Sequence, residues 1–203
     1  MIPNLPPLYF IRHGETDWNK NALVQGSIDT DLNETGVAQS IALARALVSL
    51  QPELLAYDFA VSPQRRAQHT MRIICEFQPR DFTTVRTDAR LRELEFGIWE
   101  GRPIAEMHAT PNYPTDPVSH YLWQPEGGES YEQGLVRVDG FLSGLTKPTL
   151  IVAHGAVCRI VIGFVCGIPG PNLTHLPTPQ GCYCVLKDGA YQWFDANHKM
   201  VRI

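Results

Sequence analysis

The sequence has no surplus of positive charge. Its 17 Lys and Arg residues stand against 21 Asp and Glu residues, which gives a formal net charge of −4. Binding of nucleic acid or of a membrane surface through a global cationic field is therefore not expected. An anionic ligand would have to be held by a local cluster of arginines.

Long hydrophobic runs are also missing. The longest apolar stretches are interrupted by His154 and Arg159, and they fall short of the roughly 20 residues that cross a bilayer. Residues 1–11 contain no Lys or Arg and include three prolines. We therefore expect neither a membrane-spanning segment nor a secretory signal.

The cysteines do not suggest a disulfide framework, because their number is odd. The five cysteines lie mostly in apolar stretches, which predicts reduced thiols and a cytoplasmic location. Cys182 and Cys184 alternate along an expected strand, but no further ligands follow at the usual zinc spacings. No metal site is expected.

What the sequence does contain is an ordinary globular composition, with 44% hydrophobic and 19% charged residues among 203. This length predicts a single domain over residues 1–203. Short apolar runs alternate with helical stretches, which predicts a three-layer α/β/α sandwich with a mostly parallel central sheet. We expect strands at 8–11, 58–61, 83–86 and 149–153, helices at 35–50, 63–77, 135–145 and 156–166, and a hairpin of 182–186 with 191–194.

Residues 103–126 break this alternation. The stretch 103–125 contains five prolines together with Tyr113, Tyr121 and Trp123. It is predicted to be an irregular excursion with one helical turn near 104–108. Long loops in compact domains are often functional, so we expect this excursion on the substrate side of the molecule.

Two histidines occupy matching positions. His13 and His154 each follow an expected buried strand, and each is followed by a glycine, Gly14 and Gly155. Ligand sites of open α/β sheets gather outside the carboxyl ends of the strands, so both imidazoles can face one pocket. A single such histidine is equally well explained as a structural residue, but two in matched contexts indicate a site.

The segment Arg12-His13-Gly14-Glu15-Thr16-Asp17-Trp18-Asn19 resembles the signature of the histidine phosphatase superfamily, which includes the cofactor-dependent phosphoglycerate mutases. The resemblance extends over nearly the whole chain and implies a phosphoglycerate mutase-like fold. Thr30 departs from it, since a proline is usual there. The further blocks that carry the resemblance are residues 25–26, 31–36, 62–70, 91–101, 127–130 and 154–159.

The resemblance implies a phosphohistidine mechanism without metal or cofactor, on a small phosphorylated substrate. A neutral imidazole can attack phosphorus directly, and arginine forks bind two phosphate oxygens at once. His13 is implied as nucleophile and Glu93 as the acid that protonates the leaving group. The remaining implied residues are Arg12, Arg66 and His154 as catalytic and phosphate-binding groups, and Asn19, Gln25, Gly26 and Gly155 as substrate-binding groups.

Two assignments have close competitors. Arg65 and Arg66 point about 100° apart on a helix, so only one faces the pocket easily, and the resemblance selects Arg66. Glu95 competes with Glu93, because both would share a face of an extended segment. The resemblance favours Glu93.

Three functions remain open. A phosphatase is favoured over a phosphoglycerate mutase, because residues 102–125 contain only one basic residue, Arg102, while a mutase must hold a carboxylate and a second phosphate. Phosphatases of similar length that it resembles act on α-ribazole phosphate, phosphoserine or sugar phosphates. A catalytically silent binding module is the third possibility. A hairpin edge near 183–194 allows a homodimer.

Overall fold

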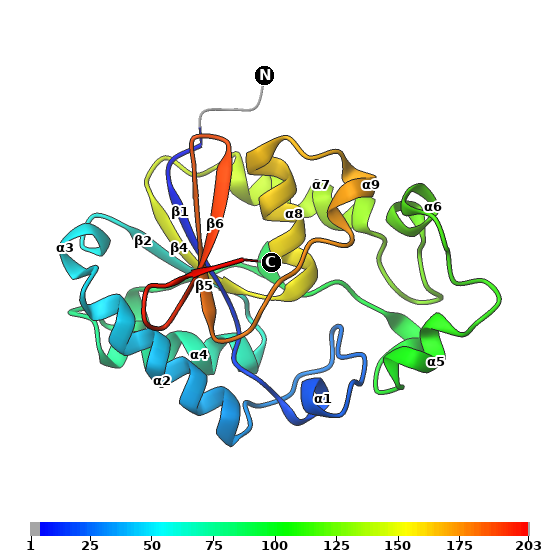
Figure 1. The fold of residues 1–203 in the computed structure, drawn as a ribbon, viewed down its shortest axis with the longest axis horizontal. Coiled ribbons are helices and arrows are strands. Elements are labelled where there is room, and N and C mark those ends of the chain that lie inside the picture. Colours follow the sequence, from blue (N-terminus) through cyan, green and yellow to red (C-terminus); the bar gives the residue numbers. More distant parts are fainter. Residues whose placement is uncertain (1–4, 203) are drawn as a thin grey trace.

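A seven-stranded sheet forms the centre of the computed structural model, which describes residues 5–202 (Figure 1). The strand order is β3-β2-β4-β1-β5-β6-β7. Strands β3, β2, β4 and β1 are parallel, whereas β5, β6 and β7 continue the sheet antiparallel. The strands are β1 (Leu8–Arg12), β2 (Asp58–Val61), β3 (Arg86–Thr87), β4 (Thr149–Ala153), β5 (Cys182–Lys187), β6 (Ala190–Asp195) and β7 (Met200–Val201).

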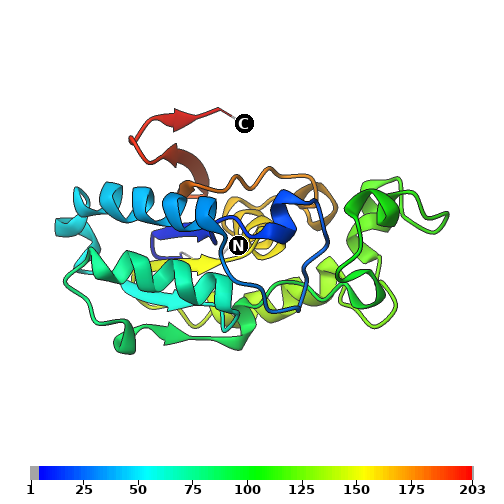
Figure 2. The ribbon, with the colours of Figure 1, turned by 90° about the horizontal axis from the view of Figure 1, so that it is seen from below.

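Helices cover both faces of the sheet, because the buried strands are apolar on both sides. Leu8 and Phe10 of β1 pack with α7 (Tyr131–Leu142) and α8 (Gly155–Cys166). Tyr9 and Ile11 point the other way, toward α2 (Glu34–Val48) and α4 (Arg65–Glu76), which lie in front of the strands in Figure 2. Each fully buried aliphatic side chain contributes about 1.5–3 kcal/mol. The three-layer α/β/α prediction is confirmed, and the parallel strands form the core of the sheet.

The helix expected to start at residue 63 starts two residues later, so the cap and proline pattern of Ser62-Pro63 is not used as a helix start. Helix α4 begins at Arg65, and its N-cap, Gln64, makes no side-chain capping bond. The hydroxyl of Ser62 instead bonds Nε2 of His154 at 2.7 Å. Helix α2 is capped by Asn33, whose side chain accepts the amide of Gly36.

The strand expected at 83–86 is present, but it begins only at Arg86. Residues Phe82–Thr84 form a 3-10 helix, η1, and the short β3 follows it. Asp81 accepts the Thr83 amide with its side chain, and the Thr84 hydroxyl donates to the Asp81 carbonyl. Such local side-chain bonds stabilise a turn in competition with a strand.

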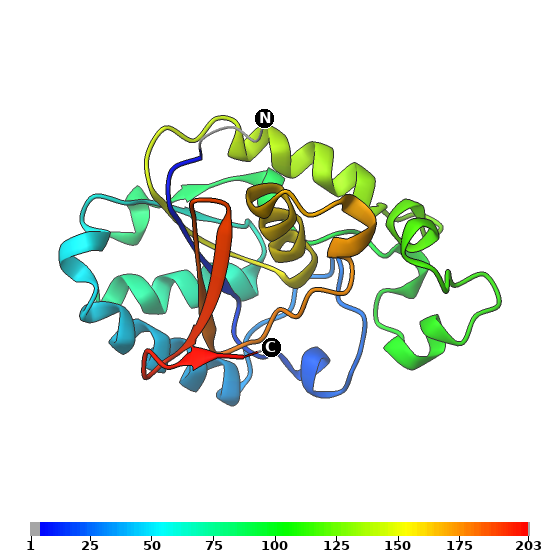
Figure 3. The same ribbon diagram turned by 45° about the horizontal axis from the view of Figure 1, so that its top comes forward.

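The 103–126 excursion is more regular than expected. It contains the predicted turn as α5 (Ile104–His108) and a further helix, α6 (Pro117–Leu122), capped by Asp116. Figure 3 shows this segment at one end of the molecule, beside the helical layer of α7. The remaining elements are α1 (Asp17–Lys20), α3 (Gln51–Leu54), η2 (Ala89–Leu91), η3 (Gly97–Trp99) and α9 (Gly170–Leu173).

The predicted hairpin is present as β5 and β6. Strand β7 pairs with β6 at Trp193 and Phe194, and so covers part of the edge on which the homodimer prediction was based. All five cysteines are free thiols. Within residues 5–202, no helix combines the length and apolar character needed to cross a membrane.

Candidate active site

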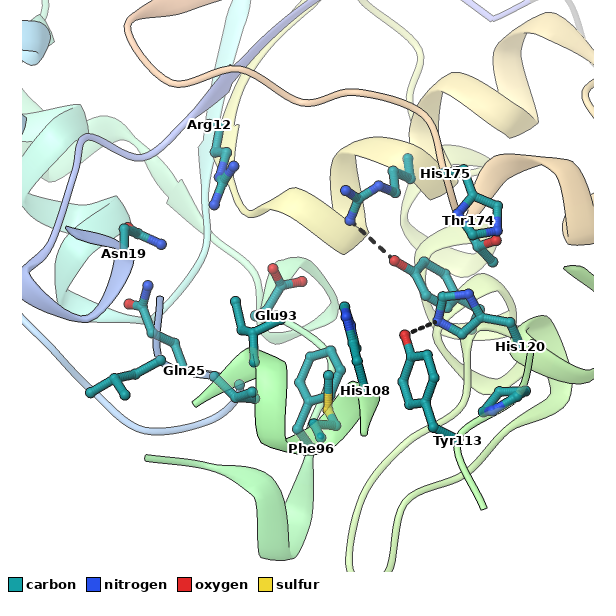
Figure 4. A pocket seen from close by; sticks show the side chains of 18 of the residues that line it. Arg12, Asn19, Gln25, Glu93, Phe96, His108, Tyr113, His120, Thr174 and His175 are labelled. Atoms are coloured by element: carbon teal, nitrogen blue, oxygen red, sulfur yellow. Dashed lines mark hydrogen bonds between the residues drawn. The ribbon is translucent and has the colours of Figure 1, made fainter. Parts of the chain in front are cut away.

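A cavity of about 720 Å³ opens at the carboxyl ends of the parallel strands. Figure 4 shows that Arg12, Asn19, Gln25 and Glu93 gather on one side of it. The predicted residues that line the cavity are Arg12, His13, Asn19, Gln25, Gly26, Arg66 and Glu93. The other two, His154 and Gly155, are not among the lining residues. The His154 ring nevertheless lies next to that of His13, with ring centroids 5.2 Å apart.

The surroundings of His13 fix the tautomer of its neutral ring. It follows β1, which is hydrogen-bonded on both sides, and its own amide donates to the carbonyl of Ala153. Its Nδ1 lies 2.8 Å from the carbonyl oxygen of Gly14. A carbonyl can only accept, so in the neutral ring Nδ1 carries the proton and Nε2 keeps its lone pair. Burial, and then the charges of Arg66 and Arg12, lower the pKa of His13 well below its ordinary value.

The loop after His13 requires two glycines. A Cβ atom on Gly14 would collide with the carbonyl of Gly36, and a Cβ atom on Gly36 would collide with the backbone of Glu15. The backbone of the first turn of α2 therefore lies directly against the backbone of the loop. The Gly14 amide also donates to the Thr70 hydroxyl of α4 at 3.1 Å. The loop is fixed by both helices on this face.

Arg12 and Arg66 supply the positive charge of the cavity. Arg12 donates from Nη1 to the Thr178 carbonyl, and Arg66 donates to the carbonyls of Ile28 and Gly26. The Nε atoms of both arginines are buried without a hydrogen-bond partner. Within residues 5–202 neither arginine forms an ion pair. Two buried cations with unused donors are complementary to an anion such as phosphate.

Arg65 and Glu95 lie outside the cavity. Arg65 is exposed and pairs with Asp29 and Asp31. Glu95 pairs with Arg92. Of each pair of neighbours, only Arg66 and Glu93 line the cavity.

Glu93 is aimed into the cavity by backbone donors. Its Oε1 accepts the Leu94 amide at 3.1 Å, and its Oε2 accepts the Ala156 amide at 3.2 Å, at the start of α8. The Glu93 amide donates to Gln64. These bonds fix the carboxyl group, which points into the cavity in Figure 4.

His154 is positioned by Ser62. The Ser62 hydroxyl accepts the Gln64 amide at 3.3 Å and bonds Nε2 of His154. If the hydroxyl donates its single proton to Nε2, the proton of the neutral ring lies on Nδ1, which is buried and has no partner. Burial, followed by the charges of Arg66 and His13, lowers the pKa of His154 well below its ordinary value. His154 is thus a neutral imidazole beside His13, and its Nδ1 is a donor in the tautomer in which Ser62 donates to Nε2.

The other predicted groups surround this centre. The Asn19 Oδ1 accepts from Thr16 and from Gln180, which leaves the amide nitrogen as a donor. Thr30, where the family usually has proline, donates to Oε1 of Gln25. Gly26 has a φ of 53° and gives its carbonyl to Arg66. A Cβ atom on Gly155 would touch the Arg12 guanidinium.

Sequence reasoning missed several lining residues. Arg159, Tyr131 and His175 line the cavity, and Ser62 acts through its hydroxyl rather than as a cap. Arg159 lies in the block 154–159, five residues after His154, which places it little more than one helical turn into α8. That spacing was the available signal, but no role was assigned to it.

No group of three or more His, Cys, Asp or Glu side chains within residues 5–202 is arranged to hold a metal ion. The positive charge around the cavity comes from arginine side chains.

The two buried neutral histidines predict a pH-dependent stability. Because the pKa of both is lower in the folded chain, the unfolded chain binds more protons below about pH 6.5. The free energy of unfolding should fall between pH 7.5 and 5.5, by up to about 1.4 kcal/mol per pH unit for each histidine. Urea unfolding in phosphate-free buffer measures this slope. His154→Asn should reduce it, exposed His69→Asn should not, and equal slopes in all three proteins would contradict the explanation.

The fold and the cavity define an α/β protein with an anion site at strand ends. A sequence model of the histidine phosphatase superfamily (branch 1) matches residues 8–196. A glucosyl-3-phosphoglycerate phosphatase of Mycolicibacterium vanbaalenii is 31% identical over 178 residues, covering 81% of this chain and 76% of that protein. A 2,3-bisphosphoglycerate-dependent phosphoglycerate mutase of Beijerinckia indica is 32% identical over 191 residues, covering 86% and 87%.

The fold comparison agrees. The solved structure of a mycobacterial glucosyl-3-phosphoglycerate phosphatase with VO3 superposes with a TM-score of 0.78 at 26% identity, covering 98% of both chains. The chain belongs to the histidine phosphatase superfamily.

Proposed function

We propose that the protein transfers the phosphoryl group of a small phosphorylated metabolite to Nε2 of His13 and then to water. The observation that carries the proposal is the bond from Nδ1 of His13 to the Gly14 carbonyl. It leaves the Nε2 lone pair available in a cavity that also contains the cations Arg12 and Arg66.

In the first step, the Nε2–P bond forms as the bond from phosphorus to the leaving oxygen breaks. Arg12 and Arg66 bind the nonbridging oxygens, and Asn19 and His154 donate further hydrogen bonds as charge shifts over them. Glu93 gives its proton to the leaving oxygen.

In the second step, water attacks the phosphorus of the phosphohistidine. Glu93, now a carboxylate, accepts the proton of that water, and the P–N bond breaks. Inorganic phosphate leaves, and both His13 and Glu93 return to their starting protonation states. No metal ion is needed, because the arginines supply the charge that metals provide in other phosphatases.

The leaving group lies toward residues 103–126. The cavity volume falls within the roughly 300–1,000 Å³ of sites that hold drug-sized ligands, so it has room for more than a phosphate group. Phe96, Met107 and Tyr113 line that side. The organic part of the substrate is proposed to contact these side chains.

The test is a labelling experiment in EDTA. Wild type is incubated with ³²P-labelled p-nitrophenyl phosphate and quenched during turnover. We expect acid-labile, base-stable label on the protein and undiminished phosphate release. Absence of label during sustained turnover would refute the covalent step, and loss of turnover in EDTA would refute the metal-free one.

Replacement of Glu93 by glutamine tests the acid. General acid–base catalysis contributes roughly 10²–10⁴ in rate, and an alkoxide needs the proton more than p-nitrophenolate does. Glu93→Gln should therefore lower kcat/KM for glycerol phosphate at least about tenfold more than for p-nitrophenyl phosphate. Glu95→Gln, outside the cavity, should leave the ratio unchanged. The same ratio in Glu93→Gln and wild type would remove Glu93 from this role.

A mutase remains the second candidate, because the mutase of B. indica is as similar to the chain as the phosphatase relative. We expect phosphate release without conversion of 3-phosphoglycerate to 2-phosphoglycerate, with or without added bisphosphoglycerate. If 3-phosphoglycerate is converted to 2-phosphoglycerate faster than phosphate is released, the protein is a mutase.

Three further predictions accompany this function. The chain acts as a single domain, it is located in the cytoplasm, and it binds neither nucleic acid nor membrane. A homodimer would have to use the part of β6 that β7 leaves uncovered, Ala190–Gln192.

A further inference from the structure

The outer half of the cavity contains a second group of basic side chains. Figure 4 shows His108, Tyr113, His120 and His175 together, across the cavity from Arg12 and Asn19. They come from α5, the loop after it, α6 and the segment that follows α9, and Arg159 joins them from α8. Among the described residues 5–202, the only carboxylate that lines the cavity is Glu93, which lies with Arg12, His13 and Arg66 in the inner half.

Arg159 is the permanent cation of this outer half. Its Nε donates to the Leu176 carbonyl at 2.7 Å, and its Nη1 donates to the Tyr131 hydroxyl at 3.2 Å. Within residues 5–202 Nη2 makes no hydrogen bond and the guanidinium makes no ion pair. The side chain is therefore fixed at one edge while its other donors remain available.

Imidazole and phenol groups surround the space beside Arg159. The His120 ring lies 5.4 Å from that of His175 and 5.9 Å from that of Tyr131, between ring centroids. The Tyr113 hydroxyl lies 3.2 Å from Nε2 of His120. Burial, and then the charges of His175, Arg159 and His108, lower the pKa of His120 to about 4. Among the described lining residues, no carboxylate of this outer half balances the charge of Arg159.

We infer that the outer half of the cavity is a subsite for a carboxylate on the leaving group of the substrate, bound by Arg159 with the imidazoles of His120 and His175. This inference rests on the proposed function. One arginine among neutral imidazoles and phenols matches a singly charged carboxylate better than a doubly charged phosphate. The substrate class is a phosphorylated hydroxy acid or a derivative that keeps the free carboxylate.

A matched pair of substrates tests the subsite. In 3-phosphoglycerate a carboxylate replaces one hydroxymethyl group of glycerol 3-phosphate, and the two are otherwise alike. Wild type should have a kcat/KM at least about tenfold higher for 3-phosphoglycerate, as expected for a charge-assisted fork. The ratio of the two values should fall to about one in Arg159→Gln and lie between in Arg159→Lys. The exposed Arg102→Gln should keep the wild-type ratio.

General damage to the active site lowers kcat/KM for both substrates alike, so it cancels in the ratio of the two values. The wild-type ratio tests the inference even if the variants do not fold. A wild-type ratio near one overturns the inference, as does an unchanged ratio in Arg159→Gln. Higher kcat/KM for propane-1,3-diol bisphosphate than for 3-phosphoglycerate also overturns it, in favour of a second phosphate.

Calorimetric binding separates this inference from the proposed function. His13→Ala should bind 3-phosphoglycerate more tightly than glycerol 3-phosphate, and His13→Ala/Arg159→Gln should not. If wild type releases no phosphate from any ester, the proposed function fails, while this binding difference still tests the subsite.

Discussion

Replacing His13 by alanine is expected to abolish turnover. The methyl group cannot form a bond to phosphorus, and no other nucleophile occupies the same position, since Nε2 of His154 is bonded to Ser62. We expect kcat to fall at least about 10⁴-fold, as for other nucleophile deletions. Initial-rate phosphate release and ³²P labelling measure the loss.

His69→Ala is the matched control, because His69 is exposed on α4 and lies outside the cavity. It should retain wild-type activity. The His13 variant should still bind inorganic phosphate, since Arg12 and Arg66 are unchanged. Turnover of His13→Ala at even one tenth of the wild-type rate would rule out His13 as the nucleophile.

Replacing Arg66 by glutamine should have the next largest effect. Its guanidinium is fully buried at the wall of the cavity, and its Nε has no hydrogen-bond partner. Loss of a preorganised donor to developing negative charge costs about 10²–10³ in rate, and we expect kcat/KM to fall by at least that factor. Arg66→Lys should remain strongly impaired, because an ammonium cannot replace the planar fork.

The neighbouring arginine provides the control for Arg66. Arg65 lies in the same turn of α4 but is exposed, so Arg65→Gln should keep kcat/KM within about twofold of wild type. Because Arg66 also holds the Gly26 and Ile28 carbonyls, thermal unfolding should accompany the kinetics. Equal kcat/KM in the two glutamine variants would show that Arg66 does not bind the transferred group.

The sequence predicted an element correctly where its local residue pattern matches the buried environment in which the element lies. Strands β2 and β4 have the predicted bounds, because both are short apolar runs with clear ends. The convergence of His13 and His154 followed from the parallel order of β1 and β4. The choice of Arg66 over Arg65 required the family resemblance, since helical geometry alone allows either.

Other features depend on contacts that span the sequence. Ser62-Pro63 has the local pattern of a helix start, but the Ser62 hydroxyl bonds a histidine 92 residues away. Arg159 is brought to the cavity by α8, and its partners Tyr131 and Leu176 lie far from it in sequence. Helix α6 was missed although its signal is local, because Asp116-Pro117 is an N-cap followed by proline at the first helical position.

The two halves of the cavity are built from different kinds of structure. The inner half sits on strand ends and helix starts of the central sandwich. In the outer half Arg159 comes from α8 of the sandwich, whereas the other side chains come from α5, the loop after it, α6 and the residue after Thr174. Insertions and substitutions in residues 103–126 can therefore change which alcohol the enzyme releases, while the groups that transfer the phosphoryl group keep their positions. Exchange of this segment between relatives is a route by which one catalytic framework can acquire new substrates, in evolution and in the laboratory.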